Sequence, residues 1–299
     1  MDLIQALQTY VAVVDAGSLV AAANKLDMST AAVSRQIAAL ERHLGVRVLN
    51  RTTRRMSMTD TGQGLYTRSQ QILTDVAEME ATIGQNTVQP GGTLRISAPL
   101  SFGIATLSKW LPGFLARYPD LRLDIDLTDR LVDLASDGVD VAIRIARQPA
   151  TTNVIASRIA SVQMITCAAP GYLKRRGRPQ APSDLSEHDT LAYTYLSSGD
   201  SWTFTHRNGE SATVRIHPRV HATNGEVLSS LALAGLGVIV QPTFIVETQV
   251  ASGRLAPLLE GWSMDGFSLY AIYLSRAFLS AKVRLFIDYL REAAAGQPV

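Results

Sequence analysis

The residues best suited to chemistry gather between positions 29 and 36, and their chemistry is hydrogen bonding rather than bond breaking. Hydroxyls, an arginine and a carboxamide follow one another as Ser29, Thr30, Ser34, Arg35 and Gln36. Short polar groups at the start of a helix can reach base edges and phosphates in the major groove. The arginine fork donates two parallel hydrogen bonds, which suits guanine edges and phosphates. This segment therefore predicts a surface that binds double-stranded DNA.

Two short helices joined by a turn are predicted to carry these groups. Helical spacing and the predicted caps place them at about 19–26 and 30–44, after a first helix that starts near Leu3 and ends at Gly17. A helix-turn-helix needs small residues where its helices cross and apolar residues on its inner faces. The small residues are Ala22, Ala23 and Ala32, and the apolar ones are Leu19, Leu26, Val33, Ile37 and Leu40.

Arginines dominate the segment that follows. Between Arg35 and Arg55 the chain has six arginines, at positions 35, 42, 47, 51, 54 and 55, and one acid, Glu41. A single arginine of this kind is normally a solvated surface charge, but six beside a helix-turn-helix pattern favour contact with phosphates. The mixture of β-branched and basic residues over 46–58 predicts the two short strands of a wing.

A long helix is predicted from about residue 59 to residue 86. Its apolar positions Leu65, Ile72, Val76, Met79 and Ile83 are spaced 7, 4, 3 and 4 apart, which is typical of a coiled-coil seam. The seam can pair with a second copy of the chain or pack on the protein's own core. The break at residues 89–92, Gln-Pro-Gly-Gly, predicts a domain boundary.

From residue 93 the pattern changes to alternating strands and helices. Strands are predicted at 93–98, 121–127 and 139–145, with helices at about 104–118 and 131–137 between them. This βαβαβ order predicts a parallel sheet covered by helices. A second, strand-rich lobe follows, in which Trp202 and Phe204 are predicted to be core residues. A strand at 268–274 and a helix at 281–295 close the chain.

These motifs resemble one family closely. The strings Ala32-Val33-Ser34-Arg35-Gln36-Ile37, Leu40-Glu41, Leu44-Gly45, Leu49-Asn50-Arg51-Thr52-Thr53-Arg54 and Thr59-Asp60-Thr61-Gly62 occur in the order found in LysR-type transcriptional regulators. The resemblance covers nearly the whole chain, with looser motifs after Gly92. Asn50 departs from the pattern, because many members carry an aromatic residue there, and we expect a small change in how the wing packs.

The resemblance implies a fold class and a set of partners. It implies an N-terminal winged helix-turn-helix, mainly α, a long linker helix, and a C-terminal α/β effector domain of two lobes that resembles periplasmic binding proteins. The implied partners are promoter DNA, a small-molecule effector, a second copy of the chain in a dimer or tetramer, and RNA polymerase if the protein activates. The expected domains are 1–60, 61–90 and 91–299, with lobe one at about 93–161 and 267–299 and lobe two at about 162–266.

The expected DNA-binding residues follow from the motif and the wing. They are Ser29, Thr30, Ala31, Ser34, Arg35, Gln36, Arg51 and Arg54.

The resemblance implies that the effector binds between the lobes, and this agrees with the tendency of ligands of open parallel sheets to collect at the carboxyl ends of strands and at helix N-termini. Ser101, Thr128 and Asn224 lie at such places, although each could simply cap a helix or end a strand. Leu100, Phe102 and Thr223 flank them. Arg144 is the one charge in an apolar strand, so it either contacts the ligand or forms a structural ion pair. Hydroxyls, amides and helix N-termini favour a small organic anion, above all a carboxylate.

Other classes of protein fit the sequence less well. The five histidines show no metal-binding spacing, and there is no Gly-x-Ser-x-Gly elbow or phosphate loop, so we expect no enzyme, no metal and no cofactor. A free-standing solute-binding protein would not need the first 90 residues. The single cysteine, Cys167, is expected to be a buried small hydrophobe. With 46% hydrophobic residues and no predicted span or signal peptide, the chain is expected to be cytoplasmic and not bound to a membrane.

Overall fold

The structure is a computed structural model that describes residues 1–51, 56–83, 91–147, 149, 154–264, 266–274 and 279–295. The side chains of residue 51 and, within the long helix, of residues 71, 74–75 and 77–83 lie outside this description. The chain divides into two compact units. The first is Met1–Gly92 with Ala135–Gly138, and the second is Thr93–Leu134 with Val139–Val299.

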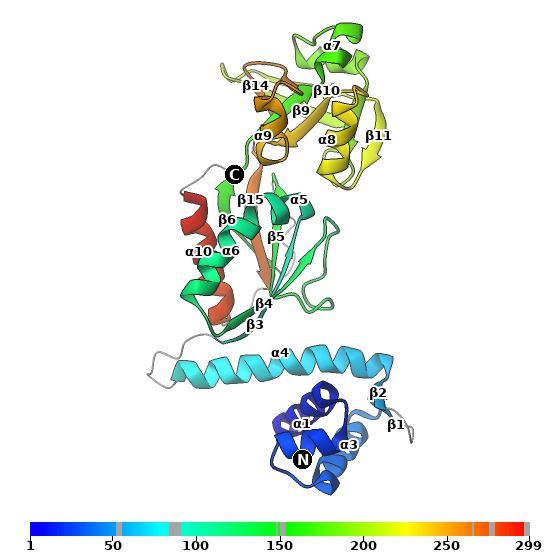
Figure 1. Cartoon of the computed structure of the whole chain (residues 1–299), viewed down its shortest axis with the longest axis vertical. Coiled ribbons are helices and arrows are strands. Elements are labelled where there is room, and N and C mark those ends of the chain that lie inside the picture. Colours follow the sequence, from blue (N-terminus) through cyan, green and yellow to red (C-terminus); the bar gives the residue numbers. More distant parts are fainter. Residues whose placement is uncertain are drawn as a thin grey trace. The chain divides into compact units, whose positions relative to one another are not determined.

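Three helices build the N-terminal end of the first unit (Figure 1). They are α1 (Leu3–Ala16), α2 (Leu19–Lys25) and α3 (Thr30–Leu44), close to the predicted ranges. Each begins at a side-chain cap, since the side chains of Asp2, Ser18 and Ser29 accept hydrogen bonds from backbone N–H groups of the first turn. Helices α1 and α3 end at glycines in the left-handed conformation, with φ of 64° and 70°.

The core of this unit lies where the three helices meet. Ala22 and Ala23 are buried at the predicted crossing, whereas Ala32 is half-buried. The inner faces of α1 and α3 supply the largest buried side chains, Tyr10, Ile37 and Leu40 among them. The helix-turn-helix pattern therefore describes how these helices pack.

Among the described residues, no single helix has the length and apolar composition to cross a membrane. The pair α1 and α2 has both when taken together, but the two helices are bent by 120° at their junction. Most of their apolar residues belong to the core of the first unit, whereas Leu3 and Val20 are exposed.

The wing and a long helix complete the first unit. Strands β1 (Leu49–Arg51) and β2 (Met56–Met58) pair antiparallel, and α4 runs over Asp60–Ile83. The predicted seam on α4 divides along its length. Leu65 packs against the core of its own unit, whereas Ile72 is 42% exposed. The side chains of Met79 and Ile83, the last two seam positions, lie outside the described residues. Residues 84–86, the end of the predicted helix, lie outside them entirely.

A five-stranded sheet forms the first lobe of the second unit. Its order is β4-β3-β5-β15-β6, with β3 and β5 parallel and β15 antiparallel to both of its neighbours. The prediction of parallel strands therefore holds for β3 and β5, but the whole sheet is mixed. The chain leaves this lobe after β6 and returns from the second lobe as β15, which runs antiparallel to its neighbours. The strands are β3 (Gly92–Ala98), β4 (Leu121–Leu127), β5 (Val141–Ala146), β6 (Val154–Ser161) and β15 (Ser268–Leu274).

The helices of this lobe differ from prediction in two places. A helical stretch starts at Leu100 rather than 104 and contains a π-helical segment, in the order α5 (Leu100–Phe102), η1 (Gly103–Leu107) and α6 (Ser108–Arg117). The predicted helix at 131–137 is wrong, since residues 134–138 form turns. Seven residues rich in aspartate and serine cannot offset the cost of helix nucleation, because such side chains compete for backbone hydrogen bonds. Helix α10 (Ala281–Ala295) has the predicted bounds.

The second lobe contains short strands and four helical segments. Trp202 and Phe204 are 2% and 0% exposed, which confirms them as core residues, and Cys167 is fully buried as predicted. The strands are β7 (Met164–Ala168), β8 (Thr190–Tyr193), β9 (Ser201–His206), β10 (Ser211–Arg215), β11 (Pro218–Ala222), β12 (Ile239–Pro242), β13 (Ala256–Pro257) and β14 (Trp262–Ser263), and the helical segments are α7 (Pro170–Arg176), η2 (Pro182–Glu187), α8 (Gly225–Leu233) and α9 (Thr243–Ala251).

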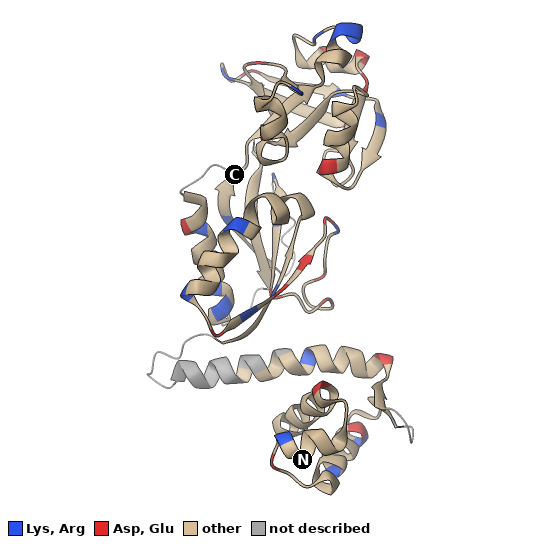
Figure 2. Cartoon of the chain, in the orientation of Figure 1, with Lys and Arg blue, Asp and Glu red and all other residues tan. Residues whose placement is uncertain are grey.

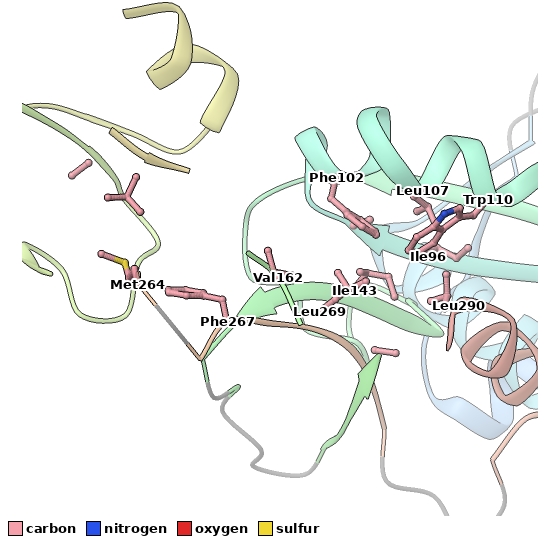
Figure 3. Close-up of a cluster of buried hydrophobic side chains, with 14 of the residues drawn as sticks. Ile96, Phe102, Leu107, Trp110, Ile143, Val162, Met264, Phe267, Leu269 and Leu290 are labelled. Atoms are coloured by element: carbon pink, nitrogen blue, oxygen red, sulfur yellow. The ribbon is translucent and has the colours of Figure 1, made fainter. Parts of the chain in front are cut away.

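Two segments connect the lobes, 161–164 and the described residues 263, 264 and 266–268, and they are called the hinge below. The backbone N–H of Val162 donates to the carbonyl of Phe267 at 2.9 Å, so the two segments are hydrogen-bonded to each other. Val162, Met264 and Phe267 join the apolar cores of the two lobes into one cluster (Figure 3). The hinge is thus packed on both sides rather than a free tether.

A buried ion pair fixes the first lobe where its sheet begins. Lys282 Nζ lies 2.9 Å from Asp140 Oδ2, and the two side chains are 2% and 3% exposed. Lys282 also donates to the carbonyl of Thr93, and the same Asp140 oxygen accepts from the backbone N–H of Arg95. The pair therefore ties α10 to the starts of β3 and β5.

The junction between the wing and α4 requires a glycine, and this can be tested. A Cβ at position 62 would lie 2.1 Å from the carbonyl oxygen of Val48, whereas a Cβ at position 64 would meet nothing within 4 Å. Gly62→Ala should lower the thermal stability of the first unit, because backbone must move. Gly64→Ala should leave it unchanged or raise it by up to about 1 kcal/mol. Equal effects in thermal unfolding of the full chain would contradict this account.

Candidate functional site

The start of α3 presents polar groups to solvent. The Ser29 hydroxyl accepts from the backbone N–H of Ala32 at 3.1 Å, so this side chain caps the helix. Thr30, Ala31 and Arg35 are exposed on the first two turns. Such a helix start offers hydroxyl, backbone and guanidinium donors to a phosphate or a base edge.

The other two predicted residues of α3 face the protein more than the solvent. Gln36 is half-buried, and its carboxamide hydrogen-bonds with the hydroxyl of Thr9 on α1. Ser34 is also half-buried and engaged in an interaction within the chain. Gln36 therefore holds α3 against α1. The sequence motif predicted only a DNA contact for this residue.

The wing is positioned by the one acid of the basic segment. Glu41 Oε1 accepts hydrogen bonds from the backbone N–H groups of Val48 and Leu49, at 3.0 and 3.3 Å. Arg51 ends β1, but its side chain lies outside the described residues, and Arg54 lies outside them entirely. Figure 2 shows basic residues on the helices of this unit, and Arg42 and Arg47 are exposed.

In the first lobe, the predicted residues gather where β3 and β4 end. Ser101 is 5% exposed and Phe102 is fully buried, both on α5, while Leu100 is half-buried. The backbone N–H of Thr128 donates to the carbonyl of Ala98 at 2.8 Å, so the residue after β4 lies beside the end of β3, just before α5. The Thr128 hydroxyl accepts from the backbone N–H of Arg130 at 3.3 Å.

In the second lobe, two carboxamides meet at the start of α8. Asn224 Oδ1 caps the helix by accepting from the N–H groups of Glu226 and Val227, at 3.0 and 3.2 Å. Its Nδ2 is buried and has no partner among the described residues. Gln241, the residue before the last of β12, is 3% exposed and also has a buried Nε2 without a partner in the described chain. Its Oε1 lies 2.8 Å from where a Cβ on Gly225 would stand.

Gln241 was missed by the sequence reasoning. A signal was available, since Gln241 is the one polar residue after the apolar run Val238–Val240 and stands at the carboxyl end of a strand. The same argument had singled out Arg144. Thr223, in contrast, is exposed.

The lobes touch beside these groups. The rings of Phe102 on α5 and Phe244 on α9 pack edge to face with centroids 6.0 Å apart. The Tyr193 hydroxyl on β8 donates to Asp129 Oδ1 at 2.9 Å. Burial and the neighbouring Asp129 carboxylate raise the pKa of Tyr193, so the hydroxyl keeps its proton. We call the residues Ser101, Phe102, Thr128, Asn224, Gln241 and Phe244 the interlobe site.

Arg144 is held by neutral acceptors. It is 8% exposed and donates to the Ile143 carbonyl, the Ser97 hydroxyl and the Arg130 carbonyl at 2.7 to 2.9 Å. No ion pair of Arg144 with another described residue is recorded, although the charge of Asp129 acts on it. Burial lowers the pKa of Arg144, and Asp129 opposes this effect. Arg144 thus braces β3 and the loop after β4 beside the interlobe site.

The chemistry that these groups can perform is recognition. The interlobe site offers amide N–H donors, a helix N-terminus and an aromatic pair. Buried donors need acceptors, and each donor left without a hydrogen bond costs about 1–3 kcal/mol of folding free energy. An oxygen-rich group placed at the start of α8 would satisfy them. Within the described residues, no group of three or more metal-binding side chains gathers.

Two family models match the chain. The model described as "Bacterial regulatory helix-turn-helix protein, lysR family" matches residues 4–63, and "LysR substrate binding domain" matches residues 88–295. The first range spans the three helices, the wing and the start of α4, and the second spans both lobes.

Known proteins resemble the chain over nearly its whole length. The transcriptional regulator PtxR of Pseudomonas aeruginosa is 35% identical over 98% of this chain and 93% of its own. DmlR of Escherichia coli is 33% identical over 98% and 94%. The solved structure of CrgA, a LysR-type transcriptional regulator from Neisseria meningitidis, is 32% identical with a TM-score of 0.58, covering 96% of this chain and 97% of its own. Full-length AphB of Vibrio cholerae is 28% identical with a TM-score of 0.59, covering all of both chains.

Proposed function

This chain belongs to the LysR family of DNA-binding transcriptional regulators, and on that premise we propose that a small organic anion bound at the interlobe site controls its attachment to a specific promoter sequence. Its N-terminal helix-turn-helix and C-terminal substrate-binding domain divide these two tasks. The protein acts as a regulator and not as an enzyme, and works in the cytoplasm, where its DNA is. The observation that supports an anionic effector is the pair of buried carboxamide N–H₂ groups beside α8 that have no partner among the described residues.

We infer a negative charge on the ligand from the hydrogen-bond donors at the interlobe site. Asn224 uses its oxygen to cap α8, so only its Nδ2 faces a ligand. Gln241 adds a second N–H₂ group, and the N-terminus of the nine-residue α8 adds a partial positive charge. Ser101 and Thr128 offer hydroxyls from the other lobe. A carboxylate satisfies donors from both lobes at once, which stabilises one lobe arrangement.

The DNA-binding surface is proposed to be the first turns of α3 together with the wing. Ser29, Thr30, Ala31 and Arg35 lie exposed on α3, and Arg51 and Arg54 of the wing add charge. Ser34 and Gln36 act from the same helix, and Gln36 does so by fixing α3 through its contact with Thr9.

The chain is proposed to work as a homo-oligomer, a dimer or a tetramer, that pairs through α4. Ile72 is the supporting residue, because it is a large apolar side chain left 42% exposed on a long helix. If the protein activates its promoter, RNA polymerase is a further partner.

The DNA interface is tested with Arg35→Ala. Removing the guanidinium should weaken operator binding by about 1–3 kcal/mol if it reads a base. Arg254→Ala is the matched control, because Arg254 is equally exposed but stands in the second unit. Gel-shift titration at fixed salt measures both variants. An affinity unchanged in Arg35→Ala would contradict the proposed docking of α3.

The effector site is tested with Asn224→Ser and Gln241→Met. Serine keeps the cap but removes the amide donor, so thermal stability should change little. Each variant should bind a carboxylate about tenfold more weakly, since hydrogen bonds to charged groups contribute about 1.5–3 kcal/mol. Calorimetry on the full chain compares benzoate and succinate with benzamide and succinamide. Binding of the amides alone, or equal binding by all variants, would show that the site is placed wrongly.

The pairing of α4 is tested with Ile72→Glu. A charge in an apolar contact should break the dimer, because the buried carboxylate has no partner. Gln63→Glu, on an exposed position of the same helix, is the control and should leave the assembly intact. Sedimentation of the full chain gives the molecular mass of each. A wild-type chain that stays monomeric at high concentration would contradict the proposed pairing through α4.

A further inference from the structure

A cavity of about 990 Å³ lies along the hinge. Both hinge segments line it, together with the loop between β13 and β14 and the end of α10. No residue of the interlobe site lines it, so the two sites are separate. Its volume is at the upper end of the range for small-molecule sites. Val162 and Phe267, labelled in Figure 3, belong to both its wall and the buried core.

The lining combines apolar surface with positive charge. Leu258, Trp262 and Phe267 supply apolar and aromatic walls, and Arg158 and Arg207 supply charge. Among the described lining residues the only carboxylate is Glu260, which lies 3.6 Å from Arg178, an arginine outside the cavity. The cavity therefore keeps two guanidinium groups that no described carboxylate neutralises.

The two arginines are prepared in different ways. Arg158 is fixed by neutral hydroxyls, with its Nε donating to Ser268 at 2.9 Å and a terminal nitrogen to Ser161 at 2.7 Å. Its remaining donors and its full charge are left for a ligand. Arg207 is exposed, and its guanidinium makes no recorded hydrogen bond or ion pair with the described residues. One cation is thus rigid and the other is free to close on a ligand.

The wall between β13 and β14 is held in a strained conformation. Leu259 has a φ of 56° although it is a bulky residue that is 3% exposed. Such backbone costs of order 1–3 kcal/mol and persists where the surroundings impose it, often at ligand sites. Gly261 follows with a φ of 95°, and a Cβ there would stand 2.9 Å from His206 Nε2. Next to this bend, Trp262 packs against His206 with ring centroids 4.9 Å apart and ring planes tilted by 52°.

We propose that the hinge cavity binds a second ligand, a small amphiphilic organic anion with an aromatic body and one acidic group. Arg158 and Arg207 bind the acidic group as charge-assisted donors. Trp262 and Phe267 contact the aromatic body. The site does not depend on the effector proposed for the interlobe site, and either could exist without the other.

The probe for this site is 8-anilinonaphthalene-1-sulfonate, whose two ring systems and single sulfonate match the lining. It is titrated into the full-length chain, and dye emission is excited through tryptophan. Arg207→Ala should weaken dye binding about tenfold, as expected for the loss of a hydrogen bond to a charged group. Arg158→Ala should do the same. Arg215→Ala is the matched control, because Arg215 is an exposed arginine on β10 that does not line the cavity.

Further arms locate the dye and test its charge. Trp262→Phe should reduce tryptophan-sensitised emission more than Trp110→Phe does, because only Trp262 lines the cavity. The uncharged analogue N-phenyl-1-naphthylamine should bind at least tenfold more weakly and ignore the arginine variants. The proposal is overturned if Arg207→Ala binds the dye like wild type, or if Ser101→Ala weakens dye binding instead. That second result would place the dye at the interlobe site.

Discussion

The effector domain depends on the way its two lobes are joined. The hinge segments are hydrogen-bonded to each other between Val162 and Phe267, and their apolar side chains continue the core of each lobe into the other. Separating the lobes would expose this core to water, so the accessible motion is a rotation about the packed segments. The interlobe site and the hinge cavity both take walls from each lobe. The hinge angle therefore sets the geometry of both.

Buried polar groups in the second unit differ in how far their hydrogen bonds are satisfied. In the first lobe, Lys282 and Asp140 neutralise each other, and Arg144 has three neutral acceptors. Such networks specify one arrangement of strands. At the start of α8, the Nδ2 of Asn224 and the Nε2 of Gln241 have no partner among the described residues. The networks around Lys282 and Arg144 hold the strands of the first lobe, while the recognition that we propose uses donors whose hydrogen bonding is incomplete.

The sequence predicted what is local and missed what depends on distant contacts. Caps at Ser18 and Ser29 and glycines after α1 and α3 set the helix bounds, because their effect acts within one turn. The predicted helix at 131–137 failed because a short apolar pattern does not outweigh nucleation. In the candidate sites, Ser101, Thr128 and Asn224 were proposed from strand ends and a cap, and they stay predictions. The contact of Gln36 with Thr9, the position of Gln241 beside Gly225 and the hinge cavity could not be predicted, because each depends on tertiary contacts.

The single thiol of the chain has a practical consequence for labelling. Cys167 is fully buried in β7, and burial raises its pKa to about 12. Because the thiolate is the form that attacks maleimides and disulfide reagents, this sulfur stays inert while the second lobe is folded. A cysteine introduced at an exposed position would be the only reactive one, so a fluorophore or spin label could be attached without removing the native residue. The rate at which Cys167 is modified would then report how often the second lobe opens.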